Sequence, residues 1–595
     1  MDATPENGCV GLVLTAIVTA MQRRIPYAVA NYEKIVEGRY HFVDKTRFIR
    51  ELENYEVPVM LRPRRFGKSL WCSILECYYD VNRKDRFEQL FANTDIGRNP
   101  TPMRNSHLVM RFDFSVVKVE FDMKGLEASF NLACRDALKV FAAENHHHAD
   151  FSGAPGIESA ADGVRHILGE VRRSGAPPVH IIIDEYDNFT NQLLTTHKDH
   201  LYKEVTTGDS FLRTFFKVIK AGIGEGTVAR VFITGVLPIT IDDLTSGFNI
   251  AQIITLEEHT LNMMGFTQAE VGTYVDTIFS ERGWPNDLQR RVLEDLRAHY
   301  NGYRLLPDAR ETLYNSTICN FYLNKLVIGN GKIPREMIDD NLRVDVNWLR
   351  RLTGGTEPAR ELVEQLMFDG ALPVDMDMLS SKFNMSRFFQ REFFPLSLYY
   401  LGMVTFRDRF SLGFPNLSVK KIFTEYFNEL EHISVSEGYT DMFRRFLSDG
   451  DWAALFAGYW ERYVGQIPAQ AFDKANENFF RTTFYELCTR YLSPDFHFAI
   501  EVNSHGGRSD WQAVGRKGSA FEGKACVIEF KHFTRKEGKR LGILTLAAPL
   551  SEDADQVERY AADLQRAHPE LAIARHVAYT VAGSSGRLLT CSCGA

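Results

Sequence analysis

The chain has 595 residues, a formal net charge of −8, and a composition that is 45% hydrophobic and 25% charged. This length exceeds what one hydrophobic core holds, so we expect three or four globular domains of ordinary composition. The negative balance argues against a protein that coats nucleic acid with its whole surface, although a locally basic groove remains compatible with it.

The N-terminus and the cysteines bear on the compartment of the protein. The longest apolar run, residues 9–21, is shorter than the roughly 18 residues of a membrane-spanning helix, and the acidic MDATPEN before it does not resemble a secretion signal. The nine cysteines are scattered without a pairing pattern, which is typical of a reducing compartment. We therefore predict a packed N-terminal helix, no membrane partner, and a cytoplasmic location, or a nuclear one in a eukaryote.

Apolar runs typical of strands alternate with amphipathic runs typical of helices over residues 55–255. This alternation predicts a parallel sheet with helices on both faces. The predicted strands are residues 57–63, 107–115, 177–187 and 229–238, and the clearest helix covers residues 127–144.

The pattern becomes helical after residue 260 and mixed again near the C-terminus. Helices are predicted at residues 267–283, 286–300, 359–369 and 439–449. In the last part, helices at residues 473–492 and 552–568 enclose predicted strands near 497–503, 509–514 and 525–530. We predict an α/β domain over residues 1–255, a helical lid with a small helical domain over 256–465, and a second α/β domain over 466–595.

The motif RPRRFGKSL, residues 62–70, follows the first strand and opens a helix. In a phosphate-binding loop, backbone N–H groups and a helix N-terminus face the phosphates, a lysine reaches the β- and γ-phosphates, and a hydroxyl binds Mg²⁺. Lys68 and Ser69 fit the last two roles. Arg62 stands where the motif has its first glycine, and it either forms the turn without a positive φ or turns its side chain outward. The predicted nucleotide-binding residues of the loop are Arg62, Pro63, Arg64, Arg65, Phe66, Gly67, Lys68, Ser69 and Leu70.

Two acidic residues, Asp184 and Glu185, end the apolar run HIII. Because a nucleotide-bound metal needs an acidic residue at the tip of a neighbouring strand, Asp184 is predicted to bind Mg²⁺ through water and Glu185 to polarise the attacking water. Thr234 ends a third apolar run. It is predicted to sense the γ-phosphate, and an ordinary strand-end threonine is the alternative. Together with the loop, these residues predict ATP and Mg²⁺ as cofactors.

Several segments of the chain together resemble the AAA-ATPase-like family, whose members commonly carry a PD-(D/E)XK nuclease-like domain at the C-terminus. They are YHFVDKTRFIREL (40–52), MLRPRRFGKSL (60–70), IIIDEYDNF (181–189), VFITGV (231–236) and YNGYR (300–304), with weaker blocks SGFNI (246–250) and FPNLSV (414–419). RPRRFGKS is the form of the loop in that family, so the missing glycine is no sign of decay. The resemblance implies a P-loop NTPase sheet of the AAA+ type, a helical lid or linker, and a restriction-endonuclease-like α/β domain.

A PD-(D/E)XK site needs two carboxylates and a lysine on adjacent strands. The carboxylates hold one or two divalent metals, and the lysine positions or activates the water. Asp510 in GGRSDWQAV and Glu529 and Lys531 in ACVIEFKHF fit this arrangement, and the last two face the same side of their strand. Trp511 and Gln512 depart from the apolar residues usual after the motif aspartate, which could shift the strand register.

Three further residues border this predicted site. Glu477 on the preceding helix is a further metal ligand candidate, Gln556 on the following helix matches a glutamine often found in the family, and Glu501 on a neighbouring strand is another candidate acid. The predicted catalytic residues are Glu185, Asp510, Glu529 and Lys531. The predicted metal ligands are Ser69, Asp184, Glu477, Asp510 and Glu529. Mg²⁺ is the expected metal, with Mn²⁺ as an alternative at the nuclease site.

These predictions lead to an ATPase coupled to a metal-dependent nuclease that acts on DNA rather than RNA. The alternative is a regulatory NTPase switch whose nuclease-like domain is inactive and only binds nucleic acid or a protein partner. A third reading, a structural scaffold, predicts no tight Mg-ATP binding. AAA+ ATPases often build their sites between subunits, so a homo-oligomer is compatible by analogy of fold. The basic segment 534–540 either contacts phosphates or is a solvated loop.

Overall fold

The computed structural model describes residues 22–244, 248–339, 346–354, 357–380, 383–436, 438–504 and 507–591. The predicted helix at residues 9–21 lies outside this part of the chain, as do residues 246 and 247 of the SGFNI block. The chain divides into two units, Met1–Pro334 with Pro373–Pro415 and Arg335–Leu372 with Asn416–Ala595. Each unit is described by itself, and the predicted domain boundaries at residues 255 and 465 remain a prediction.

The first unit contains a sheet of five parallel strands, which confirms the predicted α/β fold class. In spatial order they are β2 (Leu108–Asp113), β3 (Val179–Asp184), β4 (Val228–Gly235), β1 (Pro58–Leu61) and β5 (Gln252–Ile253). All residues of β1 and β3 are buried, which explains their continuous apolar runs. The four predicted strands are confirmed, and β5, which has only two residues, was missed.

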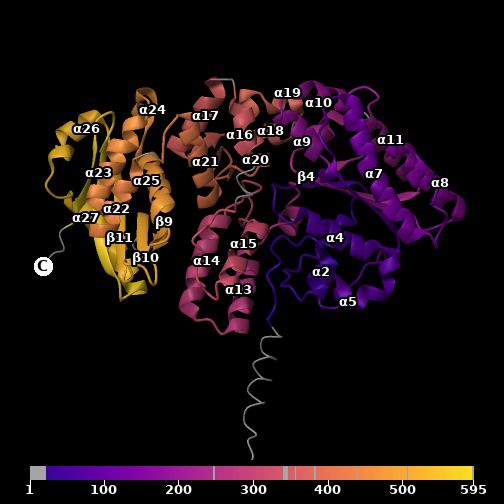
Figure 1. The fold of residues 1–595 in the computed structure, drawn as a ribbon, viewed down its shortest axis with the longest axis horizontal. Helices are drawn as coiled ribbons and strands as arrows, with labels where there is room; N and C mark the ends of the chain where they lie inside the picture. The colour runs from indigo at the N-terminus through magenta and orange to yellow at the C-terminus, as the bar shows by residue number, and fades with distance from the viewer. Residues whose placement is uncertain are drawn as a thin grey trace, which may run out of the picture. The chain divides into compact units, whose positions relative to one another are not determined.

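Helices cover the two faces of this sheet. Helix α4 (Lys68–Tyr79) packs on β2, β3 and β4 and contacts α2 (Tyr32–Glu37) beside it, as Figure 1 shows. On the other side, α7 (Met123–Asn145) packs on β2, α11 (Phe211–Gly224) packs on β4, and α8 (Ala160–Ser174) contacts both helices. The predicted helix at residues 127–144 is thus confirmed within α7. Because α4 begins at the end of β1, its N-terminus faces the carboxyl edge of the sheet.

Three helices follow the sheet within the first unit. They are α13 (Gln268–Arg282), α14 (Asn286–Tyr300) and α15 (Ser316–Ile328), and neighbours in sequence pack together. The first two confirm predicted helices, and Thr267 starts α13 with a reciprocal capping box to Glu270. The strands β7 (Thr405–Phe406) and β8 (Ser411–Gly413) form a short antiparallel pair in the same unit.

The second unit contains a mixed five-stranded sheet in the order β13, β12, β11, β10, β9. Strands β9 (Phe496–Ser504), β10 (Gly507–Gly515) and β11 (Lys524–Phe533) are antiparallel, and β11 pairs with β12 (Ala572–Val581) in parallel. The three predicted strands are confirmed. Strands β12 and β13 (Gly586–Thr590) were not predicted from the sequence.

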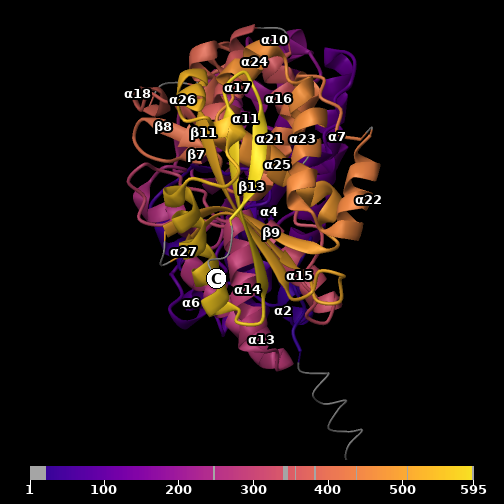
Figure 2. The ribbon, with the colours of Figure 1, turned by 90° about the vertical axis from the view of Figure 1, so that its left-hand side faces the viewer.

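Helices α25 (Glu477–Leu492) and α27 (Ser551–Ala567) lie on opposite sides of the strands in Figure 2. The first packs on β9, β10 and β11, and the second on β10, β11 and β12. The predicted helix at residues 473–492 is divided, because the Asn476 side chain accepts a hydrogen bond from the Phe479 amide and so starts α25 at Glu477. This cap fixes where Glu477 and the residues after it meet the sheet.

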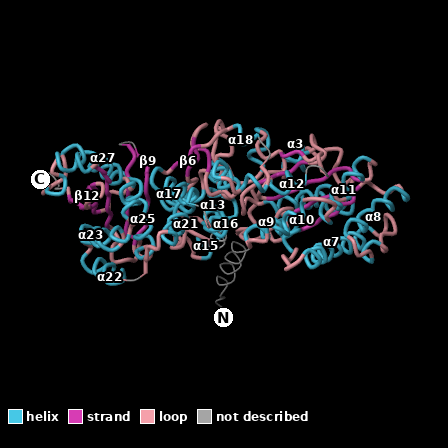
Figure 3. The backbone as a smooth tube through the Cα atoms, turned by 90° about the horizontal axis from the view of Figure 1, so that it is seen from above, coloured by secondary structure: helices cyan, strands magenta, loops and turns pink. Residues whose placement is uncertain are grey.

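Further helices of the second unit surround α25. Helices α17 (Glu357–Asp369) and α21 (Leu417–Leu430) pack against it, as the view from above shows (Figure 3). Helices α22 (Tyr439–Asp449) and α23 (Trp452–Arg462) pack against each other. The predicted helices at residues 359–369 and 439–449 are confirmed. In the described residues, no helix is both long and apolar enough to cross a membrane.

Candidate functional site

The RPRRFGKS loop connects β1 to α4 and turns through left-handed backbone conformations. Gly67 is the residue before α4 and has φ +88°, and Arg65 has φ +72°. Glycine adopts a positive φ without steric cost, which accounts for the glycine before the lysine. The loop therefore turns the N-terminal amides of α4 toward the carboxyl edge of the sheet, where anions are favoured.

Arg62 forms the turn without a positive φ, and its side chain points into the protein. The residue is 1% exposed. Its guanidinium donates to the carbonyl oxygens of Leu61 and Thr255 through Nη1 at 2.9 and 3.0 Å, and to that of Leu261 through Nη2 at 3.1 Å. The outward-turned alternative is wrong, because these carbonyls attract the side chain inward. Burial lowers the pKa of Arg62 to about 10.

Lys68 lies at the mouth of the turn as the first residue of α4. Its Nζ donates to the carbonyl oxygens of Arg62 at 3.0 Å and Pro63 at 3.2 Å. Burial lowers the pKa of Lys68, and the nearby carboxylates of Glu185, Asp187 and Asp184 oppose that shift. The ammonium is thus held among loop carbonyls and acidic side chains at the carboxyl edge of the sheet.

The YNGYR segment and the start of α15 contact the RPRRFGKS loop. Phe66 packs edge-on against Tyr303, with ring centroids 5.0 Å apart. The Arg64 carbonyl accepts from Asn315 Nδ2 at 3.2 Å, and the Arg65 carbonyl accepts from the Thr317 amide at 3.1 Å. Asn315 and Thr317 therefore hold the backbone of the loop, and Tyr303 places the YNGYR segment against it.

Asp184 is buried at the end of β3 and is held by two neighbours. The Thr234 hydroxyl donates to Asp184 Oδ1 at 2.8 Å, and Arg111 Nη2 lies 3.3 Å from Asp184 Oδ2. Thr234 is itself fully buried at the end of β4 and also accepts from the Glu185 amide at 3.4 Å. In the structure Thr234 therefore orients the acidic pair. Arg111 on β2 was missed, although an arginine inside the apolar run HLVMRFDFS is the signal that could have found it.

Glu185 has φ +49°, a left-handed conformation that strains a residue with a side chain. Burial raises the pKa of Glu185, the Lys68 charge lowers it, and the Asp184 and Asp187 charges raise it further, with a net upward direction. A carboxylate whose pKa is raised is a stronger base than a solvated one. Glu185 therefore combines a strained backbone with a raised pKa, two features that are common at functional sites.

A cleft of about 260 Å³ opens beside the loop. It is lined by six of the predicted nucleotide-binding residues and by the predicted catalytic residue Glu185. The six are Arg65, Phe66, Gly67, Lys68, Ser69 and Leu70. Its other walls are largely apolar and come from the N-terminal segment, α4 and the residues before α13, including Val29, Phe42, Trp71, Met263 and Phe266. Polar groups of the loop thus lie next to a largely apolar surface, a combination typical of small-molecule binding pockets.

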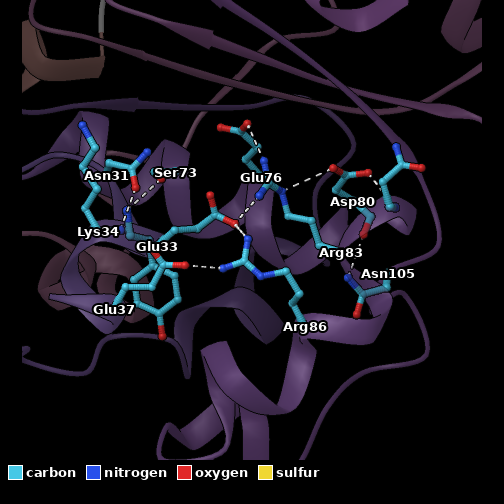
Figure 4. A network of polar contacts seen from close by, with 12 residues as sticks. Asn31, Glu33, Lys34, Glu37, Ser73, Glu76, Asp80, Arg83, Arg86 and Asn105 are labelled. Atoms are coloured by element: carbon cyan, nitrogen blue, oxygen red, sulfur yellow. Dashed lines mark hydrogen bonds and ion pairs between the residues drawn. The ribbon is translucent and has the colours of Figure 1, made fainter. Parts of the chain in front are cut away.

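A series of ion pairs connects Asp184 with helix α2. Arg111 Nη1 lies 3.2 Å from Glu76 of α4, and Glu76 lies 3.5 Å from Arg83. Arg83 then pairs with Glu33 on α2, and Figure 4 shows this part of the network. The ion pairs that lead away from Asp184 therefore involve side chains from four elements, namely β2, α4, the 3-10 helix Val81–Arg86 and α2.

The second site lies on β10 and β11 of the second unit. The strands pair Trp511 with Ile528, and one step further along this antiparallel register Asp510 comes opposite Glu529. Trp511 is fully buried. The departure from the usual motif at Trp511 and Gln512 thus leaves the two predicted carboxylates side by side.

Glu529 is held by a lysine and a glutamine. Its Oε1 accepts from Lys531 Nζ at 2.9 Å and from Gln556 Nε2 at 2.6 Å, and Lys531 Nζ also donates to Gln556 Oε1 at 3.1 Å. The residue is 3% exposed, and its Oε2 has no hydrogen-bond partner within the part of the chain that the structure describes. Among the described residues, one buried oxygen of the Glu529 carboxylate therefore has no hydrogen-bond donor.

The acidic side chains of this site interact through their charges. Burial, followed by the Asp510 charge, raises the pKa of Glu529 to about 7. Burial and the Asp510 charge also raise the pKa of Glu477. Burial lowers the pKa of Lys531, but its bond to Glu529 and the surrounding carboxylates outweigh this and raise it overall. Asp553 on α27, which sequence reasoning missed, adds to the charge near Glu477 and Lys531.

Arg481 on α25 also bonds to carboxylates of this site. Its Nη1 donates to Asp510 Oδ1 at 2.5 Å and its Nη2 to Glu501 Oε1 at 2.6 Å. Asp510 Oδ2 accepts from the Phe530 amide at 2.9 Å. Arg481 was also missed, and its place one helical turn after Glu477 is the signal that could have found it.

The carboxylates of this site fit a hard divalent ion that keeps some of its water ligands. Over the described residues, no group of three or more His, Cys, Asp or Glu side chains is placed to hold a metal ion. Mg²⁺ is usually bound by one or two carboxylates, with waters and substrate phosphates completing its octahedron. Asp510 and the unpartnered Glu529 Oε2 offer that incomplete set, so these residues fit such an ion.

The two regions that contain the candidate sites each match a protein-family model. Residues 26–245 match the family model described as predicted AAA-ATPase, and residues 475–588 match that of the PD-(D/E)XK nuclease superfamily. The chain combines an AAA-ATPase-like domain with a PD-(D/E)XK nuclease superfamily domain. A search of curated proteins finds no match.

These two families give the residues of each site a context. The AAA-ATPase-like match contains the loop, Asp184, Glu185 and Thr234, and the PD-(D/E)XK match contains Glu477, Asp510, Glu529, Lys531 and Gln556. Domains of these families generally use a nucleotide and a divalent metal, and a nuclease-like domain indicates nucleic acid as the partner class. ATPase and nuclease-like functions are therefore supported at the level of family.

Proposed function

We propose that the AAA-ATPase-like domain binds and hydrolyses Mg-ATP and that the PD-(D/E)XK domain cleaves phosphodiester bonds of nucleic acid, with DNA as the expected substrate. The observation that carries the nuclease part is the arrangement of three side chains. Asp510 and Glu529 lie opposite each other on β10 and β11, and Lys531 Nζ lies 2.9 Å from Glu529 Oε1. Two carboxylates and a lysine on adjacent strands are the set that a metal-dependent PD-(D/E)XK nuclease site needs.

In the ATPase site, the positions of Gly67, Lys68 and Ser69 support a role for each of these loop residues. Lys68 would bind the β- and γ-phosphates, and the amides after Gly67 would face their oxygens. Mg²⁺ held by Ser69 and Asp184 would neutralise phosphate charge when bound. Glu185 would orient the attacking water and accept its proton on a carboxylate oxygen, which its raised pKa favours.

In the nuclease site, Asp510 and Glu529 would hold Mg²⁺ or Mn²⁺, with Glu477 as a further acidic neighbour. That ion, when bound, supplies charge stabilisation at the phosphate and acidifies water. Lys531 Nζ, which is 2.9 Å from Glu529 Oε1, would orient the attacking water and stabilise charge on the phosphate oxygens. Gln556 bonds both residues and keeps them in this arrangement.

The proposal is tested by assaying purified protein on plasmid, linear and single-stranded DNA and on RNA, with and without ATP, in Mg²⁺ and in Mn²⁺. We expect ATP hydrolysis that Lys68→Ala abolishes, and cleavage that Glu529→Ala and Lys531→Ala abolish. If both C-terminal variants keep every nucleic-acid activity of the wild type, the nuclease part is wrong, and a regulatory ATPase with an inactive nuclease-like domain takes its place.

A further inference from the structure

Arg481 brings a buried positive charge into the PD-(D/E)XK site from α25. The residue is 8% exposed, and its guanidinium bonds Asp510 Oδ1 at 2.5 Å and Glu501 Oε1 at 2.6 Å. A third bond, from Nη2 to Asn478 Oδ1 at 3.2 Å, ties it to its own helix. These three partners fix the guanidinium, so it belongs to the site rather than to the solvated surface.

The fold keeps Glu501 in a strained conformation that accompanies this contact. Glu501 has φ +57° although it lies in β9. A residue with a side chain adopts this left-handed region only where its surroundings hold it there. The strand therefore departs from regular geometry at Glu501, whose carboxylate accepts from Arg481 in addition to that of Asp510.

A second cationic side chain, Lys531, bonds to the other carboxylate, Glu529. Lys531 Nζ is 2.9 Å from Glu529 Oε1, and Arg481 is bonded to Asp510, which lies opposite Glu529 on the neighbouring strand. Two fixed positive charges thus bracket the carboxylate pair. In the described part of the protein, Glu529 Oε2 is the oxygen of this pair without any hydrogen-bond partner.

In a two-metal site, a pair of divalent ions roughly 3.5–4 Å apart stabilises the attacking and leaving oxygens. We propose that Arg481 takes the electrostatic place of the second ion, so that this site binds a single divalent ion at Glu529 Oε2 and Asp510. Arg481 stays on Asp510 and Glu501 as a fixed cation. The inference rests on the proposed nuclease function, but it concerns metal stoichiometry and is read without measuring cleavage.

The test is a Mn²⁺ titration of the nucleotide-free full-length chain, in which electron paramagnetic resonance counts bound ions. Wild type is expected to bind one ion more than Glu529→Gln. Arg481→Met is expected to bind more Mn²⁺ at equal free concentration, either as a second ion or with about tenfold higher affinity, because a charge next to the ligands is gone. Two ions in wild type beyond those that Glu529→Gln binds, or unchanged or weaker binding by Arg481→Met, would overturn the inference.

Glu501→Gln gives a test of opposite sign that leaves Arg481 in place. With one carboxylate fewer, the Arg481 charge acts more fully on Asp510, so Mn²⁺ binding is expected to weaken severalfold; unchanged or tighter binding contradicts the inference. Arg481→Lys, which keeps the charge, is expected to return binding toward the wild-type value. Arg566→Met changes an arginine of α27 whose side chain is 71% exposed, and it serves as the control without effect.

Two outcomes separate this inference from the proposed function. If one Mn²⁺ binds as predicted and both variants shift binding as stated, but no nucleic acid is cleaved, the inference holds and the nuclease function fails. If wild type binds no ion beyond what Glu529→Gln binds, both fall together.

Discussion

The two candidate sites are built in different ways. Around the ATPase loop, charged side chains bond mostly to backbone, since Lys68 and Arg62 both donate to carbonyl oxygens. In the nuclease-like site, side chains bond to side chains, as Glu529 does with Lys531 and Gln556. The first site depends on the local course of one chain segment. The second depends on the register of strands and helices that are distant in sequence.

This difference predicts how each site fails. A backbone-built site should be sensitive to changes that alter the turn, even where space for a side chain exists. A site built from paired charges should be sensitive to pH and to the removal of single partners. Four predictions test this contrast, from the largest expected effect to the smallest.

Lys68→Ala removes the ammonium that the loop carbonyls and acidic side chains hold. ATP hydrolysis is expected to fall by about 100-fold or more, the usual loss when a preorganised charge-stabilising donor is removed. A steady-state ATPase assay measures this, with Lys217→Ala as the control, because Lys217 is a half-exposed surface lysine paired with Asp209. Retention of more than a tenth of the activity would contradict the assigned role.

Glu529 should make the metal-free protein less stable as the pH rises. Its pKa is raised to about 7 in the folded state, so between about pH 4.5 and pH 7 the folded chain binds more protons at this group than the unfolded chain does. Stability should therefore fall as pH rises through that window, by about 3 kcal/mol at most in the contribution of Glu529.

Chemical denaturation of wild type and Glu529→Gln at several pH values measures this contribution. Because glutamine does not titrate, the variant should gain stability relative to wild type as the pH rises toward 8. An equal pH dependence for both proteins would mean that Glu529 is ionised at ordinary pH without cost, and the charge-coupled view of this site would fail.

Gly67→Ala tests the backbone-built site without removing a functional group. A Cβ added at Gly67 would meet only Ser316 Oγ, at 3.5 Å, so space is available, but its φ of +88° would strain an alanine. This strain is worth about 1–2 kcal/mol. We expect about tenfold weaker ATP binding, measured by calorimetry. Gly224→Ala, at an open position in α11, should leave binding unchanged, and equal effects of both variants would refute the argument from the turn.

Thr234→Val keeps the shape of the side chain but removes the hydroxyl that orients Asp184. Turnover of ATP is expected to fall about fivefold, which corresponds to roughly 1 kcal/mol for a lost hydrogen bond, and Thr234→Ser should restore most of it. The turnover number at saturating ATP is the measurement. Full activity of the valine variant would show that Asp184 is held well enough by Arg111 alone.

The sequence predicted the two sites unequally, and the contrast in their construction explains why. The loop residues are consecutive, so their pattern could be read directly, together with the Asp184–Glu185 pair at the end of an apolar strand. The inward turn of Arg62 could not be read, because its partners Thr255 and Leu261 are far away in the sequence. Such a contact depends on how the chain returns to β1.

In the C-terminal domain, too, the local spacing of residues was predictable and the contacts between distant segments were not. The spacing of Glu529 and Lys531 on one strand was enough to place them on one face. Arg481 was missed because its role depends on β9 and β10 meeting beside α25, and the strain at Glu501 has no sequence signature. Strand β12 was missed as well, although the run AIARHVAYTV has the β-branched and aromatic content of a strand.

The central claim is that one chain carries two separate hydrolytic sites, and one paired measurement tests it most directly. ATP hydrolysis and metal-dependent DNA cleavage are measured side by side for wild type, Lys68→Ala and Glu529→Gln. We predict that wild type does both, that Lys68→Ala loses ATP hydrolysis, and that Glu529→Gln loses DNA cleavage while it still hydrolyses ATP. DNA cleavage that survives in Glu529→Gln, or no cleavage by wild type in any metal, would contradict the claim.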